Sequence, residues 1–231
     1  MIGAVIMIAL TSCSPSIDTQ DIFDDPRVVE LADAACRGDA LSVRRLLHGG
    51  APLEAKGKKG VTPLVAAIAC GNSDGVRALI EAGAQVNVDV EETHSPLKVA
   101  VKHNNLDVVL LILEAGADIY YLPKKSRNNA IGDAFDVGFA TGDWTIYEYF
   151  LKDKIDINRP ISNSGKEDIV AYAASLRRYD KVLELLENGY GGDINKILKY
   201  AEEDNSSNES NAKLRDEVIA RIGELKANHK N

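Results

Sequence analysis

The chain has 231 residues, of which 45% are hydrophobic, so it is long enough and apolar enough to bury a core. Its formal net charge is −8. Because a nucleic-acid-binding surface needs clustered Lys and Arg to neutralise phosphates, this charge excludes nucleic acid as an expected partner.

The N-terminus combines a short apolar run with a cysteine. Residues 2–10 carry no charge, but a membrane-spanning helix needs about 20 apolar residues, so the run is typical of a signal peptide instead. Leu10, Thr11, Ser12 and Cys13 follow, and together they resemble the lipobox of bacterial lipoproteins. The resemblance implies a signal peptide over residues 1–12 and acylation of Cys13.

Acylation of Cys13 implies a location for the protein. Several acyl chains hold a protein firmly in a membrane, whereas a single chain binds only reversibly. Ser14, rather than Asp, follows the cysteine, which in Gram-negative lipoproteins goes with the outer membrane, so we expect an anchored protein that faces the periplasm. The alternative is a cytosolic protein with an apolar N-terminus and an incidental cysteine. Residues 13–26 contain four aspartates with Pro15 and Ser16, a composition that cannot build a core, and they are predicted to form a flexible tether.

A period of 33 residues organises the middle of the chain. Gly50-Ala51 returns as Gly83-Ala84 and Gly116-Ala117, and Thr62-Pro63-Leu64 returns as Ser95-Pro96-Leu97. This period and these signatures resemble the ankyrin repeat. The resemblance implies two antiparallel helices and one projecting β-hairpin finger in each unit, and it covers residues 27–193 in about five units.

Each unit is predicted to have a capped first helix and an apolar second helix. Thr62 and Ser95 can cap first helices by accepting a backbone N–H, while Pro63 and Pro96 occupy the first turn, where a missing N–H costs nothing. The second helices carry apolar residues at helical spacing, and glycines in the left-handed conformation end them. The predicted core residues are Val43, Leu46 and Leu47; Val76, Leu79 and Ile80; Val108, Leu111 and Ile112; Ile146, Tyr149 and Phe150; and Val182, Leu185 and Leu186, with closing glycines at Gly50, Gly83, Gly116 and Gly189.

The fourth and fifth units match the pattern loosely. Gly142-Asp143 falls 38 residues after Asn104-Asn105 instead of 33, so extra residues lie between them. Because Gly116-Ala117 is still in register, the insertion is expected in the finger spanning residues 120–131.

Residues 194–231 follow the repeats and are predicted to form a C-terminal helical cap, in which the polar run from Glu202 to Asn211 is a linker before a terminal helix. The helix is expected from Ala212, with Leu214, Val218, Ile222 and Leu225 on one face. It is expected to cap the last unit, the alternative being a free amphipathic helix for a partner or a membrane. The predicted fold is therefore an all-α solenoid of about five ankyrin repeats with hairpin fingers and a C-terminal capping helix.

The sequence offers no catalytic or metal-binding constellation. The four histidines do not pair at metal-ligand spacing, so we expect no enzyme activity, no metal, no cofactor and no small-molecule substrate. Trp144 and its aromatic neighbours have helical spacing and are predicted to fill the core. Cys36 and Cys70 lie on adjacent units. Because packed helices lie about 10 Å apart and a disulfide needs Cα atoms within about 7 Å, we predict two buried thiols.

The finger tips carry the candidate partner-binding residues. In ankyrin proteins the tips and the first helices line the concave surface that holds the partner. One alternative is that neighbouring tips only attract one another as exposed ion pairs, worth about 0–1 kcal/mol each. The enlarged third finger favours binding, because tyrosines beside a cation are typical interface anchors. The candidates alternate in charge from tip to tip: Lys58 and Lys59, then Glu91 and Glu92, then Lys124, Lys125 and Arg127 beside Tyr120 and Tyr121.

The sequence thus predicts a monomeric, membrane-anchored adaptor or inhibitor that holds a protein partner on its concave face. More specific versions are an immunity protein that neutralises an antibacterial toxin in the periplasm and a stress-linked periplasmic scaffold. A cytosolic ankyrin regulator of an enzyme is the alternative for a chain whose N-terminus is not a signal peptide.

Overall fold

The computed structural model describes residues 17–90, 94–121, 144–152, 156–158, 168–205 and 208–228. Across these residues the regular structure is helical, with one isolated antiparallel bridge between Val90 and His94. The chain divides into two compact units, residues 1–126 and 127–231, and each is described by itself.

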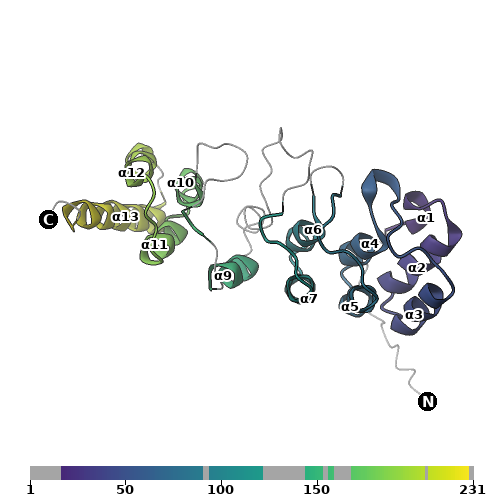
Figure 1. The fold of residues 1–231 in the computed structure, drawn as a ribbon. Coiled ribbons are helices and arrows are strands. Elements are labelled where there is room, and N and C mark those ends of the chain that lie inside the picture. The colour runs from purple at the N-terminus through teal and green to yellow at the C-terminus, as the bar shows by residue number, and fades with distance from the viewer. Residues whose placement is uncertain are drawn as a thin grey trace, which may run out of the picture. The chain divides into compact units, whose positions relative to one another are not determined.

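The first unit is built from consecutive helix pairs (Figure 1). A short helix α1 (Thr19–Ile22) precedes the inner helices α2 (Pro26–Cys36), α4 (Pro63–Cys70) and α6 (Pro96–Lys102) and the outer helices α3 (Ala40–His48), α5 (Ser73–Glu81) and α7 (Leu106–Glu114). Each inner helix contacts the next inner helix, and each outer helix contacts the next outer helix. The fingers are the segments that join one pair to the next: finger one is residues 49–62, finger two is residues 82–95, and finger three begins at residue 115.

Polar side chains begin these helices. Thr62 and Ser95 each accept a hydrogen bond from the backbone N–H three residues on, at 3.4 and 3.2 Å, and a proline follows each of them. The two predicted N-caps are therefore confirmed. The outer helices begin after Asp39, Asn72 and Asn105, whose side chains also accept backbone N–H groups of the first turn.

Residues in the left-handed conformation end the helices at the predicted positions. Gly50, Gly83 and Gly116 follow the outer helices with φ of 84°, 93° and 88°. Gly71 ends α4 with φ 76°, and Asn104, at the corresponding place after α6, has φ 52°. After glycine, asparagine is the residue that adopts this conformation most readily. The third helix pair therefore keeps the same turn without a glycine.

Small residues bring the helices of the first unit close together. Val43, Val76 and Val109, each four residues after the cap of its outer helix, are fully buried. Gly75 of α5 packs so closely on the carbonyl group of Ala35 that an added Cβ would overlap it. The core between the pairs therefore depends on alanine and glycine as much as on branched residues.

A disulfide joins Cys36 at the end of α2 to Cys70 at the end of α4, with the two Cα atoms 5.3 Å apart. The prediction of two buried thiols is wrong. The spacing of about 10 Å on which it relied separates helix axes, whereas residues on the facing sides of two helices lie nearer. Here the facing sides carry alanines, including Ala32 and Ala66 in one buried cluster, so the helices approach within disulfide reach.

Residues 17–25 are folded onto the repeats. Helix α1 packs on α2, the Thr19 hydroxyl donates to Asp33 at 2.5 Å, and Phe23 is buried. Asp18 and Asp25 accept backbone N–H groups at the starts of α1 and α2, so these aspartates are helix caps. The predicted tether over residues 13–26 is wrong for this part, and residues 13–16 lie outside the described residues.

The second unit begins with helices at the predicted places. They are α9 (Trp144–Lys152), α10 (Ile169–Ser175) and α11 (Tyr179–Glu187). Ile146, Phe150 and Val182 are buried as predicted, and Gly189 follows α11 with φ 89°. The side chain of Trp144 lies outside the described residues, as do residues 122–143, which include most of the enlarged finger.

The chain ends in a pair of helices, α12 (Ile194–Glu203) and α13 (Glu209–Asn228). The predicted linker, Glu202 to Asn211, is therefore wrong at its two ends, which belong to α12 and α13, and the last helix begins before Ala212. Helix α13 packs on α11 and α12 and buries Val218 and Ile222, as expected of a cap. Between the two helices the buried carboxylate of Asp204 accepts from the Tyr179 hydroxyl at 2.9 Å, which ties the pair to α11.

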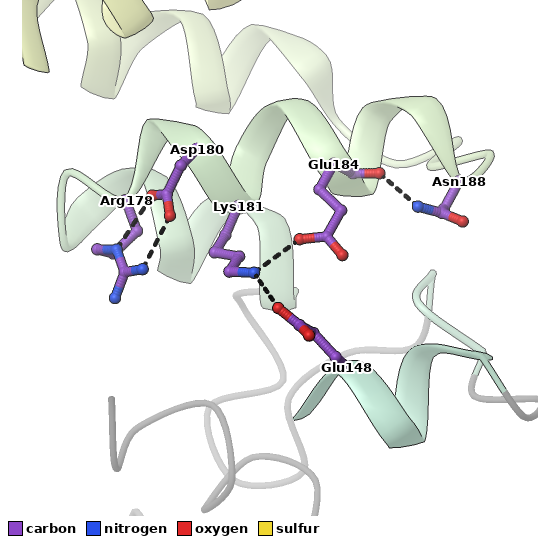
Figure 2. Close-up of polar contacts among 6 residues, drawn as sticks. All are labelled: Glu148, Arg178, Asp180, Lys181, Glu184 and Asn188. Atoms are coloured by element: carbon purple, nitrogen blue, oxygen red, sulfur yellow. Dashed lines mark hydrogen bonds and ion pairs between the residues drawn. The ribbon is translucent and has the colours of Figure 1, made fainter. Parts of the chain in front are cut away.

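Lys181 of α11 connects this helix to α9 (Figure 2). Its side chain is only 10% exposed, and its Nζ lies 3.3 Å from a carboxylate oxygen of Glu148 and 2.9 Å from one of Glu184. Burial lowers the pKa of Lys181, but the hydrogen bonds and charges of the two carboxylates outweigh burial and raise it above the ordinary value. The lysine is therefore charged, and its pairing holds α9 against α11.

Candidate functional site

A pocket of about 240 Å³ opens on the inner face of the first unit. Its walls come from the N-terminal segment that includes α1, from the inner helices α4 and α6, and from fingers one and two. The lining is mainly aliphatic, with one lysine and two histidines. The lining residues are Ile17, Ile22, Val61, Val65, Ala66, Ala69, Val90 and Val99, together with His94, Lys102 and His103.

The floor of the pocket is formed by residues of α4 and α6 that lie on the same face of their helix. Val65 and Ala66 of α4 lie four and three residues before Ala69, so each shares a face of that helix with Ala69. Val99 of α6 likewise lies three residues before Lys102. The short alanine side chains leave the space that longer residues would fill, so the floor of the pocket is a consequence of the small residues in α4.

Two buried aliphatic clusters flank the pocket and fix its walls. One cluster contains Phe23 and Ala66 with Ile22 packed against it, and the other contains Val65 and Val90. Val61 packs against both clusters. The pocket is thus a gap in a continuous aliphatic surface, and the walls on either side are held by core packing.

The fingers are tied to one another by side chains that bond backbone groups of the next finger. Asn87 accepts the N–H of Asp118 at 2.9 Å and donates to the carbonyl of Gly116 at 3.0 Å. Asn158 of the second unit accepts the N–H of Gly191 at 2.7 Å, so the same device occurs there. These bonds set the course of each finger relative to its neighbour.

Tyr121 takes part in this connection between fingers. Its hydroxyl donates to the Asp89 carboxylate at 2.8 Å, and its side chain is half-buried. Burial, and then the bond to Asp89, raise the pKa of Tyr121 to about 12. Tyr121 is therefore not the exposed anchor that was predicted, because its polar end is engaged within the protein.

The structure separates the predicted finger-tip residues into three groups. Lys58 and Lys59 form an exposed turn, η1 (Lys58–Gly60), at the tip of finger one. Tyr120 is exposed, with 38% of its surface accessible, whereas Tyr121 is not. The remaining predicted residues lie outside the described residues: Glu91, Glu92, Lys124, Lys125, Arg127 and the acylation candidate Cys13.

The pocket itself was not predicted from the sequence. Alignment of the units at their period of 33 residues places Lys102 opposite Ala69 and His103 opposite Cys70. Lys102 thus replaces the small residues Cys36 and Ala69 that stand at this position in the first two units. This departure from the repeat was the available signal.

The stacked helix pairs define an all-α repeat protein, and the comparisons with known proteins name the repeat. Residues 31–121 match the family described as ankyrin repeats in three copies. The crystal structure of the human ASB11 ankyrin repeat domain is similar, with a TM-score of 0.60 and 22% sequence identity over 84% of this chain and 82% of that chain. No curated protein matches the chain. Residues 31–121 therefore match ankyrin repeats, and the predicted all-α solenoid class is confirmed.

Ankyrin repeats are a protein-interaction scaffold that is typically without catalytic activity. Their presence shows a protein–protein interaction module. Within the described ranges, no group of His, Cys, Asp and Glu side chains is arranged to hold a metal ion. No helix in the described part of the chain is both long and apolar enough to cross a membrane.

Proposed function

We propose that this chain binds a protein partner on the inner face of its first unit, over the pocket between α1, α4 and α6. The observation that carries the proposal is an open aliphatic recess on the face formed by the inner helices and fingers. Interfaces are held together by a few side chains that fill such recesses, while the surrounding contacts contribute little. A preformed pocket also avoids the entropy cost of ordering the binding site.

Site-specific photo-cross-linking tests this proposal in living cells. A photoreactive phenylalanine analogue at position 103, which lines the pocket, is expected to form a covalent adduct with a partner protein. The same analogue at position 41 is the matched control, because Leu41 is 76% exposed on the outer helix α3. Adducts at both positions, or at neither, would contradict binding at the inner face.

We further propose that the protein is anchored in the outer membrane through acylated Cys13 and faces the periplasm. The sequence from Leu10 to Cys13 supports the anchor. The disulfide between Cys36 and Cys70 supports the compartment, because disulfides persist in the periplasm and are reduced in the cytosol. The same bond disfavours a cytosolic regulator of an enzyme.

Two measurements test the anchor and the compartment separately. Labelled fatty acid is expected to enter the wild-type protein and not the Cys13→Ala variant. Cys36 and Cys70 are expected to resist alkylation in cells until a reductant is added. Labelling that persists without Cys13 would remove the anchor, and cysteines that react without reductant would favour the cytosolic alternative.

An immunity role and an adaptor role would use the same surface, and they differ in phenotype. If the partner is an antibacterial toxin, deletion of the gene should make cells sensitive to their toxin-delivering siblings, and a Lys102→Glu variant should fail to protect them. If cells without the gene survive contact with these siblings as well as wild-type cells do, the immunity role is contradicted and the adaptor role remains.

A further inference from the structure

We infer that the pocket accepts one apolar side chain of a partner protein and that Lys102 pairs with a carboxylate next to that side chain in the partner's sequence. This inference rests on the proposed function and specifies the partner's chemistry. It predicts a linear segment in which a branched aliphatic or aromatic residue is adjacent to Asp or Glu.

The size of the pocket selects the kind of occupant. A cavity of about 150 Å³ holds a benzene molecule, and sites for drug-sized ligands have about 300–1,000 Å³. At about 240 Å³ the pocket lies between these limits. It therefore suits one large apolar side chain and part of its backbone, and it is small for a nucleotide or a similar cofactor.

The charge beside the pocket selects the neighbour of that side chain. Lys102, in the last turn of α6, is exposed, and the ion pairs within the described ranges do not include it. The described residues that line the pocket include no carboxylate, and His103 adds a second basic side chain next to Lys102. Asp18, on the α1 side, is engaged with the N–H of Gln20 as a helix cap. A partner carboxylate beside the pocket would thus meet an available cation.

A groove on the outer face provides a contrast. It lies between α3 and α5 and contains both Arg44 and Glu81. These two side chains pair with each other at 3.1 Å, so that groove carries no excess charge for a partner to neutralise. The inner pocket differs because its cation has no such acidic neighbour among the lining residues.

The test starts from selection of peptides against the full-length protein. A displayed library of random linear peptides of about twelve residues is expected to yield sequences with an apolar residue next to Asp or Glu, since linear motifs bind through such anchors. Selected peptides are synthesised with a fluorescent label, and their affinity is measured by anisotropy. Peptides with no acidic preference, or failure to select any peptide, would overturn the inference.

Variants locate the binding and test the pairing. Ala69→Phe should fill the pocket and lower peptide affinity at least about tenfold, and Lys102→Glu should do the same by reversing the charge. Leu41→Glu on the outer face should leave affinity unchanged. A peptide whose acidic residue is replaced by Lys should regain affinity for the Lys102→Glu variant, which a misfolded variant could not show. Undiminished binding to Ala69→Phe, or absence of this rescue, would also overturn the inference.

The outcome also distinguishes this inference from the proposed function. If a protein is cross-linked at position 103 while the peptides show no acidic preference or no dependence on Lys102, only the partner's chemistry is wrong. If no protein is cross-linked at position 103, the proposed function fails first.

Discussion

Cys36 and Cys70 occupy nearly equivalent places in consecutive repeats, 34 residues apart, and their side chains are covalently joined. The bond connects α2 to α4 directly, so the first helix pair and the second are held together by more than packing. Because Ala66 and Ala69 of α4 form part of the pocket floor, the bond also fixes the helix on which the proposed binding site is built.

Loss of this bond is expected to lower the free energy of unfolding of the first unit by about 3–4 kcal/mol, because the unfolded chain regains the freedom of the closed loop. The measurement is urea unfolding of the Cys13→Ala protein with and without a reductant. A protein that also carries Cys36→Ala and Cys70→Ala is the control, and its stability should not respond to reductant. Equal unfolding midpoints for the oxidised and reduced forms would contradict the disulfide.

Replacement of Tyr121 by Phe is expected to remove one phenol that ionises near pH 12. Its pKa is raised above the unfolded value of about 10, so the folded state keeps the proton that the unfolded state loses. The stability linked to this group is therefore complete below pH 10 and is lost as the pH rises through 12. The ionisation of Tyr121 is measured from the absorbance of phenolate during an alkaline titration. The Tyr120→Phe variant is the control and should keep this ionisation.

Removal of the two carboxylates around Lys181 is expected to cost more than removal of the lysine. A protein with Glu148→Gln and Glu184→Gln deprives a largely buried ammonium group of these two carboxylates, and we expect a loss of about 1–3 kcal/mol in stability. The Lys181→Met variant keeps the packing and leaves no buried charge unpaired. Its free energy of unfolding should therefore change by less than about 1 kcal/mol. Chemical denaturation compares the two, and a larger loss in Lys181→Met would contradict the structure.

Gly75→Ala is expected to destabilise the protein, although alanine is ordinarily the better helix former by about 0.5–1 kcal/mol. The reason is the overlap between the new Cβ and the carbonyl of Ala35, which should cost about 1–3 kcal/mol. Gly223→Ala in α13 is the matched control. Nothing lies within 4 Å of a Cβ at that position, so this variant should be stabilised. Thermal unfolding of both variants should show shifts of opposite sign.

The repeat period made much of the fold predictable. It located the outer helices, and local rules then identified caps such as Thr62 and turn residues such as Gly83, because these depend on a few neighbouring backbone groups. Long-range proximity was harder to predict. The approach of Cys36 to Cys70 depends on alanines that line both helices, which a single generic spacing between helices does not represent.

Composition misled the prediction at both ends of the chain. Asp18 and Asp25 were taken as signs of a solvated tether, although an aspartate before a helix is also its usual cap. At the other end, the polar composition of Glu202 to Asn211 favours a linker, although the first two of these residues end α12 and the last three begin α13. The pocket was missed for a different reason, since it depends on side chains from α1, two inner helices and two fingers that only the folded chain brings together.

The covalent link between α2 and α4 also decides how the protein responds to force. If the N-terminus is held at a membrane and a bound partner pulls on the repeats, tension entering through α2 passes across the sulfur bridge into α4. Residues 37–69 are then outside the load path. Helix α3 and finger one lie within this loop and cannot be lengthened by such a pull, so the pocket residues that the loop contributes, Val61, Val65, Ala66 and Ala69, would be shielded from traction.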